Sequence, residues 1–505
     1  MKKVSSYDSE FCGSLPLHLI NYIQPYGYLI VLKKSDLSVI QVSENTAELW
    51  QCQTKSLIGT LFLDFIDPLE KETLRGKFKA EFSDRIPLPL TITFNSIRKE
   101  LLALIHIKND LIILELEILS ADIKNSFITV YQNLRHSVYA IEKETSLIAV
   151  SKAVLRELKK ISGFDKVMMY QFDDNWNGTV IAEDNNEELF ESYLGLTFPA
   201  SDIPKQARDL YLKNSYRLIP EREYSAVGLY PVINPITNGF LDLSDCNLRS
   251  VPKVHLEYLK NMDVRASMSI RVLKDDKLWG LISCHSHTSK YLNYELCSVF
   301  ELLSNVISNK ISSVINKEEF SFTTRLNEGR SDLIDQIYME KDLFAGLLGS
   351  EHNINHLLDT TGAAVTYDNR IETLGSAPDK EFIANLVYWL QAKKINQTHY
   401  ELNLAEEFDL AAGYTDVASG IIVITINQEK GEYIIGFRPE QQRTIRWGGN
   451  PNEAITFEAD NKTYHPRNSF KLWQETVKQT CKAWKQSELD VAERFRSFLY
   501  EFTTR

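Results

Sequence analysis

Runs of apolar residues alternate with short polar turns through the first quarter of the chain. Over residues 28–50 this pattern predicts a strand, a Lys-Lys-Ser-Asp turn, a second strand and a helix that begins at Ser43 or Asn45. Further strands are predicted at residues 89–96, 101–108 and 111–119. We therefore expect a small α/β domain of the α+β kind, with an antiparallel sheet, at residues 28–123.

Residues 1–27 form a leader ahead of this domain. Ile20 and Ile23 are apolar, but the segment has no clear periodicity. Such a leader has to bury its apolar residues outside the sheet that follows it. Cys12 lies in the polar first part of the leader, where a lone thiol is usually incidental.

A second domain is expected at residues 124–312, with antiparallel strands flanked by helices. It begins with a helix predicted at residues 124–162, and two strands follow around an Asn-Gly turn at Asn177 and Gly178. A later helix leads into two strands around a Lys-Asp-Asp turn. The connection at residues 230–252 has little regular pattern, and loops of that length inside compact domains are usually functional or disordered.

The pattern stays mostly helical over residues 292–348, which is more than one domain needs. Such a helix is typical of a connecting spine or of a dimer seam, so we expect a homodimer through long helices. A third α/β domain is expected at residues 313–485, with an excursion of the chain at residues 432–477. A last helix, at 486–505, shows no stop signal and is expected to lead into a further domain.

Composition and charge exclude several classes of function. Lys and Arg number 56 against 68 Asp and Glu, and the net charge of −12 works against non-specific binding of nucleic acid. No apolar run reaches the roughly 18 residues of a membrane span, and the N-terminus lacks the apolar segment of a signal peptide. The 6 cysteines show no metal-finger spacing and no disulfide framework. We expect a cytoplasmic protein with reduced cysteines that binds neither membranes nor nucleic acid.

One acid lies between two prolines at residues 198–211. Pro199 and Pro204 disfavour helix in the residues before them, so Asp202 is held on a stiff turn ahead of a helical pattern. Its side chain and its backbone carbonyl can each accept hydrogen bonds. The simpler alternative is an acid that caps the following helix.

The helix after Pro252 has a polar face. His255, Tyr258, Leu259 and Met262 are spaced at i, i+3, i+4 and i+7, so they share one side of the helix. One imidazole and one phenol therefore look into the same interior. The alternative is an ordinary core helix whose polar pair is satisfied internally.

Two arginines and two serines suit an anionic ligand. Arg217 follows the Asp202 helix and Arg249 precedes the His255 helix, while Ser267 and Ser269 alternate along a strand and so face one way. Because a guanidinium group is a planar fork that matches a carboxylate, the set suits two carboxylates. Surface salt bridges are the ordinary alternative.

His285 and His287 alternate at the end of a strand, so one of them can face the interior with His255. Cys284 points to the opposite face, and no acid or cysteine completes a ligand set, so we expect no metal. A hydrolase with Cys12 as nucleophile and His255 as base would still need a third group, so no catalytic residue is assigned.

At the end of the 432–477 excursion the spacing of apolar residues is compatible with two kinds of secondary structure. Around Phe470 the apolar positions fit both a strand and a helix. Arg467 and Ser469, two residues apart, would exchange places relative to a fixed partner if a strand became a helix. Most short segments of this kind are simply ambiguous.

Five motifs then occur in one order behind the N-terminal cysteine. They are Ile-Gln-Pro-Tyr-Gly at 23–27, Pro-Ala-Ser-Asp-Ile-Pro at 199–204, the run at 248–262, Trp-Gly-Gly at 447–449 and Pro-Arg-Asn-Ser-Phe at 466–470. Together they resemble the photosensory module of a bacteriophytochrome over essentially the whole chain. The resemblance implies PAS, GAF and PHY domains at the boundaries given above.

The resemblance implies a bound biliverdin IXα, a linear tetrapyrrole, joined by a thioether to Cys12. It places the Asp202 carbonyl and His255 near the pyrrole N–H groups. The other residues implied in binding are Tyr170, Phe198 and Tyr258 around the D ring, His285 at the D-ring carbonyl, Arg217, Arg249, Ser267 and Ser269 at the propionates, and Ile203 and Met262.

It also implies that the leader passes through the connection at 230–252, a lasso, in a figure-of-eight knot that buries Ile23. One departure from the family pattern concerns the propionates. Pro252 and Lys253 stand where many relatives have Ser-Pro, so one hydroxyl is missing there.

The excursion is similar to the tongue of these proteins. The resemblance implies that Arg467 pairs with Asp202 in one state and that Ser469 meets it in the other, with Trp447 as a further switch residue. These residues are expected to couple the pigment to the fold of the tongue.

We therefore expect a red/far-red photoreceptor that switches between Pr and Pfr forms and controls a downstream output domain, such as a histidine kinase or a diguanylate cyclase. Within these residues the chemistry expected is self-attachment of the bilin. The alternatives are a cysteine-dependent enzyme and a GAF-type small-molecule sensor without photochemistry.

Overall fold

The computed structural model describes residues 16–79, 85–119, 127–349, 352–451, 455–457 and 464–504. The chain forms two compact units. Unit 1 comprises Met1–Ser312 and Trp447–Trp473, and unit 2 comprises Ser313–Arg446 and Gln474–Arg505. No helix within the described ranges combines the length and the apolar character needed to span a bilayer.

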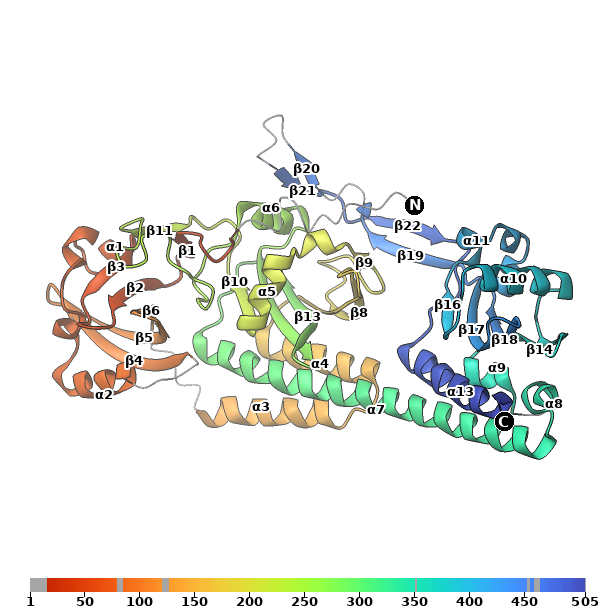
Figure 1. The fold of residues 1–505 in the computed structure, drawn as a ribbon. Coiled ribbons are helices and arrows are strands. Elements are labelled where there is room, and N and C mark those ends of the chain that lie inside the picture. The colour runs from red at the N-terminus through yellow and green to blue at the C-terminus, as the bar shows by residue number, and fades with distance from the viewer. Residues whose placement is uncertain are drawn as a thin grey trace. The chain divides into compact units, whose positions relative to one another are not determined.

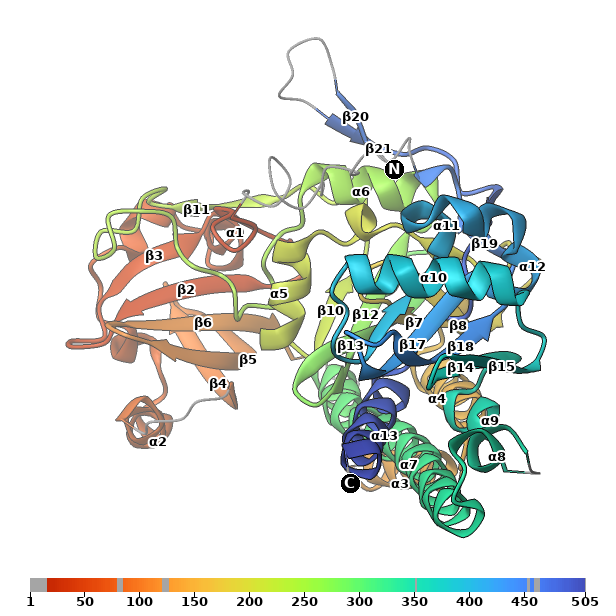
Figure 2. The same cartoon turned by 45° about the vertical axis from the view of Figure 1, so that its right-hand side comes forward.

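The first sheet of unit 1 is antiparallel, in the order β1-β11-β3-β2-β6-β5-β4. Figure 2 shows its strands from β11 to β4. The helices η2, η3 and α2 pack on one of its faces, around Trp50, Phe62 and Leu74. The strands predicted at residues 28–123 are all present. The elements are β2 (Tyr28–Lys33), β3 (Val39–Ser43), α1 (Thr46–Leu49), η2 (Thr54–Leu57), η3 (Phe62–Phe65), α2 (Pro68–Lys79), β4 (Ile86–Phe94), β5 (Ile97–Lys108) and β6 (Leu111–Ile118).

The leader and the lasso, residues 230–252, cover the opposite face of this sheet. β1 (Tyr22–Ile23) pairs with β11 (Val227–Tyr230), and on its other side Ile23 forms a bridge with Arg249. Ile23 is 0% exposed, as predicted, because Val227 of β11 and Arg249 of the lasso flank it. Threading of the leader through a closed loop stays a prediction.

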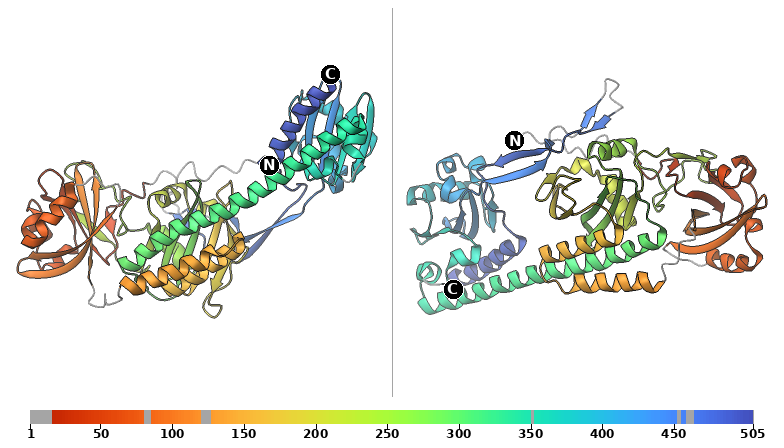
Figure 3. Two further views of the ribbon diagram at one scale, coloured as in Figure 1. Left: turned by 90° about the horizontal axis from the view of Figure 1, so that it is seen from below. Right: turned by 180° about the vertical axis from the view of Figure 1, so that it is seen from behind.

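The second sheet of unit 1 has the order β10-β12-β13-β7-β8-β9 and is extended by β19 and β22. On one side lie α3, α4 and the first part of α7, and α5 and α6 lie on the other (Figures 1 and 3). The strands are β7 (Lys166–Phe172), β8 (Gly178–Asn185), β9 (Thr197–Phe198), β10 (Tyr216–Ile219), β12 (Ala266–Lys274), β13 (Lys277–Ser286), β19 (Arg443–Gly448) and β22 (Leu472–Val477). The helices are α3 (Phe127–Glu142), α4 (Leu147–Ser162), η4 (Ala200–Asp202), α5 (Lys205–Lys213), α6 (Lys253–Asn261) and α7 (Tyr294–Glu340).

The single helix expected at residues 124–162 is wrong in one respect, because the chain forms two helices there. α3 ends at Glu142, and Ser146 caps α4 by accepting a hydrogen bond from the Ala149 N–H group. The sequence already carried this N-cap signal inside the predicted helix. α3 and α4 therefore pack against each other as an antiparallel pair (Figure 3).

Unit 2 is built on an antiparallel sheet in the order β15-β14-β18-β17-β16. One face packs on α8, α9, α13 and the last part of α7, and the other packs on α10 and its neighbours. The strands are β14 (Gly362–Tyr367), β15 (Arg370–Gly375), β16 (His399–Glu401), β17 (Gly420–Asn427) and β18 (Glu432–Arg438). The helices are α8 (Leu343–Leu348), α9 (Ile354–Leu358), α10 (Lys380–Ala392), α11 (Leu404–Glu407), η5 (Asp409–Gly413), α12 (Thr415–Ala418) and α13 (Gln486–Thr504).

The predicted start of the excursion at Glu432 is wrong, because the chain leaves this sheet later. Glu432–Arg438 is strand β18, which lies between β14 and β17 and is buried along its length. Only residues 439–477 leave the sheet, and these residues are called the tongue below. The tongue contains β19, β20 (Ile455–Phe457), β21 (Tyr464–Pro466) and β22.

Candidate functional site

Unit 1 encloses a cavity of about 230 Å³, whereas the next cavity measures about 10 Å³. The second sheet, α5, α6, the lasso and Leu17 of the leader form its wall. Every described residue predicted to bind the pigment lines this cavity, and Cys12 lies outside the described residues. The lining includes Tyr170, Phe198, Asp202, Ile203, Arg217, Arg249, His255, Tyr258, Met262, Ser267, Ser269 and His285.

The register of the second sheet brings the polar residues together. Arg217 of β10 lies directly opposite Ser269 of β12, and Ser269 lies opposite Ser283 of β13. One step along, Ser267 lies opposite His285. Because residues directly opposite each other share a face of a sheet, these two rows point into the cavity together.

Neither Arg217 nor Arg249 forms a salt bridge with an acid among the described residues, which speaks against the alternative of surface salt bridges. The guanidinium of Arg217 donates to the backbone carbonyls of Asn247, at 2.9 Å, and of Arg249, while Arg249 donates to the Leu17 carbonyl at 3.2 Å. Each Nε atom is buried without a hydrogen-bond partner in the described part of the chain. Burial and the neighbouring charge of Arg217 lower the pKa of Arg249 to about 9. The pair therefore favours an anionic ligand.

The two histidines of the cavity are held neutral. Burial, together with the charge of Arg217, lowers the pKa of His255 to about 4. Burial, followed by the charges of Lys166 and His255, lowers the pKa of His285 to about 3. His285 Nδ1 is buried and has no hydrogen-bond partner among the described residues. A neutral imidazole has one N–H donor and one acceptor, so each can orient a polar group of a ligand.

Asp202 lies on η4 but does not cap α5, whose N-cap residue is Pro204 with no side-chain cap. Its carboxylate instead accepts a hydrogen bond from the Tyr258 hydroxyl at 2.8 Å and one from the Arg467 guanidinium. Burial raises the pKa of Asp202, and the Arg467 charge and the Tyr258 hydroxyl act against that rise. The capping alternative is therefore wrong.

The turn around Asp202 is braced by Arg208, which the sequence analysis missed. From α5, its guanidinium donates to the backbone carbonyls of Ala200 and Ile203, at 3.5 and 2.6 Å, and stacks over Trp176. The only sequence signal was its place on the helix that leaves the turn. Among the described residues no backbone N–H group is bonded to the Asp202 carbonyl, so this carbonyl can accept from a ligand.

Arg467 brings the tongue to this turn. Its guanidinium also donates to the carbonyl of Gly448 and lies over the rings of Phe198 and Phe470. Nearby, Trp447 is buried, and β19 pairs in parallel with β9 through Trp447 and Thr197. Gly449 has a φ of +103°, where a side chain would be strained, so the Trp-Gly-Gly motif is a backbone requirement of this corner.

Ser469, the predicted partner of Asp202 in a second state, is exposed. β22 gives the end of the tongue a strand conformation, one of the two that the sequence allowed. The structure thus places Arg467, and not Ser469, at Asp202.

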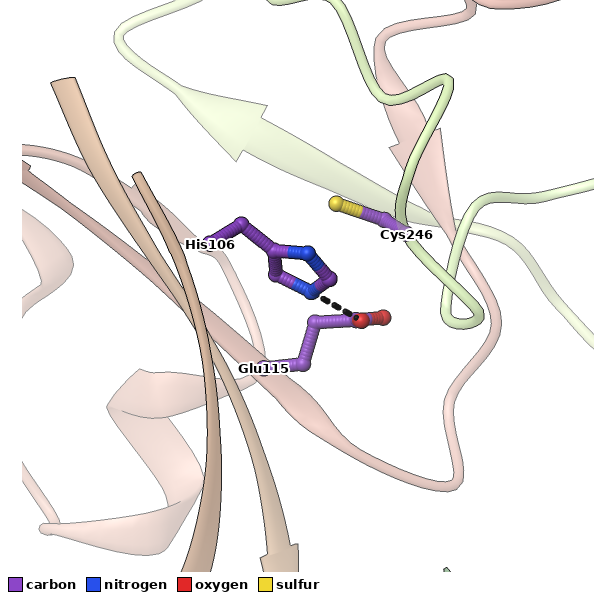
Figure 4. Close-up of side chains that lie close together, drawn as sticks. All are labelled: His106, Glu115 and Cys246. Atoms are coloured by element: carbon purple, nitrogen blue, oxygen red, sulfur yellow. Dashed lines mark hydrogen bonds and ion pairs between the residues drawn. The ribbon is translucent and has the colours of Figure 1, made fainter. Parts of the chain in front are cut away.

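A buried group that the sequence analysis did not anticipate joins the first sheet to the lasso (Figure 4). His106, Glu115 and Cys246 lie within 4.8 Å of one another, and His106 Nε2 is 2.7 Å from Glu115 Oε1. Histidine, glutamate and cysteine are residue types that bind zinc in proteins. Glu115 Oε2, however, already accepts a hydrogen bond from the Leu248 N–H group at 2.6 Å. Because both carboxylate oxygens are engaged, the group acts as a hydrogen-bonded junction.

Three family models match the sequence in order. They are a PAS fold over residues 12–119, a GAF domain over residues 146–311 and a phytochrome region over residues 326–505. The prediction of these three domains from the motifs is confirmed.

Curated relatives cover nearly the whole chain. Cyanobacterial phytochrome B of Nostoc is 37% identical over 492 residues, which are 97% of this chain and 65% of that protein. A bacteriophytochrome of Pseudomonas aeruginosa is 32% identical over 498 residues, which are 97% of this chain and 66% of that protein. The chain thus spans slightly less than two thirds of these relatives.

Solved structures match over their full length. The phytochrome photosensory core module of Stigmatella aurantiaca is 32% identical, with a TM-score of 0.83, and the match covers 98% of this chain and 99% of that one. A bacteriophytochrome from R. palustris is 29% identical, with a TM-score of 0.84 and the same coverage. This chain belongs to the phytochrome family.

Proposed function

We propose that this chain is the light-sensing part of a red/far-red photoreceptor and that its cavity binds biliverdin IXα. The observation that carries the proposal is the arginine pair of the cavity wall, in which Arg249 is buried and Arg217 partly buried. Neither has an acid partner among the described residues, and both Nε atoms are buried there without a hydrogen-bond partner. A linear tetrapyrrole has apolar rings, pyrrole N–H donors and two carboxylates, and the cavity offers partners for each.

The carboxylates would be held by the guanidiniums and by the hydroxyls of Ser267 and Ser269. Tyr211 also lines the cavity and hydrogen-bonds Ser269, so it adds a phenol beside these hydroxyls. The Asp202 carbonyl suits the pyrrole N–H groups beside His255, and the unpaired His285 nitrogen suits a ring carbonyl.

When bound, such a pigment supplies absorption of red light and isomerisation at its C15=C16 double bond. The residues of this chain couple that event to the tongue. Tyr258 lines the cavity and donates to Asp202, and Asp202 accepts from Arg467, so a change at the Tyr258 ring alters the environment of a tongue residue through one carboxylate. In the other state, Ser469 would replace Arg467 at Asp202.

Cys12 would hold the pigment by a thioether. Its thiol would add across a vinyl side chain, with sulfur bonding one carbon and the proton going to the other, so no oxidant is needed. Leu17, five residues later, lines the cavity, and five extended residues span up to about 17 Å, which brings Cys12 within reach.

The proposal extends to a cytoplasmic homodimer with a downstream output domain and with no catalysis here beyond pigment attachment. Tyr139 of α3 and Phe320 of α7 are 72% and 73% exposed, and apolar groups so exposed on long helices suit a helical seam. Light scattering on the purified chain measures the oligomeric state, and a monomer at micromolar concentration would contradict the homodimer.

The direct test is to mix the apoprotein with biliverdin. We expect absorbance in the red, reversible under alternating red and far-red light. Arg217→Ala with Arg249→Ala should weaken pigment uptake, whereas Arg443→Ala, on the exposed part of the tongue, should not. Absence of red absorbance would refute the proposal, and uptake without photoconversion would favour the non-photochemical sensor.

A further inference from the structure

Helix α6 has a second polar face, away from the cavity. His255 and Tyr258 line the cavity, whereas Glu257 and Asn261, four residues apart, share a different side of the helix. On that side α6 meets strand β21 of the tongue (Figure 1).

Two contacts join α6 to the tongue there. His465 Nδ1 lies 3.0 Å from both carboxylate oxygens of Glu257, and each residue is about 40% exposed, at 41% and 39%. The Asn261 side-chain amide donates to the backbone carbonyl of Arg467 at 3.1 Å. Arg467 is thus held at two points, with its side chain on Asp202 and its backbone on Asn261.

The Asn261 contact depends on the backbone conformation of the tongue. In an α-helix the carbonyl of residue i accepts from the N–H group of residue i+4, which for Arg467 is Lys471. In the structure Arg467 directly follows β21 and lies outside any helix, and its carbonyl accepts from the Asn261 side chain instead. A helical tongue would therefore remove the acceptor of Asn261.

We propose that Asn261 and Glu257 are positioning residues that select the extended form of the tongue and hold Arg467 in front of Asp202. The proposal rests on the proposed function only for the role of the tongue in signalling. The contacts themselves involve residues of unit 1 alone and need no pigment.

The test is hydrogen exchange of the tongue in darkness, with the pigment-loaded protein and with the apoprotein. Asn261→Asp keeps the shape but removes the donor, and Glu257→Gln removes the charge. Because each contact is partly exposed, we expect exchange at β21 to rise by roughly fivefold in either variant and more in the double variant. Lys260→Ala, an exposed position on the same helix, is the matched control and should leave exchange unchanged.

A rescue experiment that reverses the charges of the Glu257–His465 pair distinguishes a positioning role from a general loss of stability. Glu257→Lys should raise exchange, and adding His465→Glu should restore protection by reversing the pair. Exchange in Asn261→Asp and Glu257→Gln equal to that of Lys260→Ala would overturn the proposal. Failure of the apoprotein to take up biliverdin would instead refute the proposed function and leave this comparison valid.

Discussion

Arg467 and Asp202, 265 residues apart in the sequence, form a buried ion pair in which the side chains are 3% and 5% exposed. A pair this deep leaves an uncompensated charge when one partner is removed. Burial already raises the pKa of Asp202, and the Arg467 charge and the Tyr258 hydroxyl act against that rise by favouring the charged carboxylate. The protonation of Asp202 and the docking of the tongue are therefore coupled.

Arg467→Ala should release the tongue and let Asp202 protonate at higher pH. Breaking a buried pair costs on the order of 3 kcal/mol, which here opposes docking of the tongue. We expect faster proteolysis within residues 439–477 and altered photoconversion of the pigment-loaded protein. Arg443→Ala removes an exposed arginine of the same tongue and is the control. Unchanged spectra and kinetics in Arg467→Ala would count against a role for the pair.

The apoprotein should lose stability as the pH falls from about 6.5 to about 4. Unfolded histidines bind a proton near pH 6.5, whereas folded His255 and His285 stay neutral until the pH reaches about 4 and about 3. The unfolded state therefore binds more protons in this window, and the free energy of unfolding falls by roughly 3 kcal/mol for each histidine. Urea unfolding at several pH values measures the slope.

The matched control lies two residues from His285. His285→Asn should remove its share of the slope, whereas His287→Asn, which replaces a residue outside the cavity wall, should not. A pH profile of His285→Asn with the parent slope would contradict the neutral state of His285.

The local pattern of apolar and polar residues predicted the helices and strands of the site and which of their faces line the cavity. The i, i+3, i+4, i+7 spacing placed His255 and Tyr258 on one side of α6, and the alternation of Ser267 and Ser269 placed both in the cavity. Helical periodicity and strand alternation are enough to predict these faces, because each depends only on residues of a single helix or strand.

Contacts between segments far apart in the sequence could not be predicted in the same way. Asp202 resembled a cap because its partners, Tyr258 and Arg467, are 56 and 265 residues away. Strand β18 was assigned to the excursion because its central place in a sheet depends on pairing with β14 and β17. Asn261 had no sequence signal and Arg208 had only its place on the helix that leaves the turn, since both side chains bind backbone carbonyls.

Cys12→Ser should abolish covalent attachment but allow the apoprotein to take up pigment, because the cavity wall is unchanged. Denaturing electrophoresis followed by pigment fluorescence measures attachment. Cys246→Ser is the control, since Cys246 lines the cavity but burial raises the pKa of its thiol well above the usual value, which keeps it unreactive. Pigment retained by Cys12→Ser, or lost from Cys246→Ser, would place the attachment site at another cysteine.

Glu115 and Glu117 lie on the same strand, β6, and should respond oppositely to conversion into glutamine. Glu115 pairs with His106 and its pKa is lowered despite burial, so Glu115→Gln breaks a buried pair and should destabilise the fold by about 3 kcal/mol. Burial raises the pKa of Glu117 from 4.5 to about 7, although Tyr291 donates to it. At pH 8 the ionised form therefore costs about 3 kcal/mol, which Glu117→Gln should recover.

That gain should depend on pH, because below the folded pKa Glu117 is already neutral in the folded protein. We expect most of the stabilisation by Glu117→Gln to be absent at pH 5, whereas the loss in Glu115→Gln should persist there, since the lowered pKa keeps Glu115 ionised. Urea unfolding of both variants at pH 5 and pH 8 compares them directly. Equal effects of the two substitutions at both pH values would contradict the opposite pKa shifts of Glu115 and Glu117.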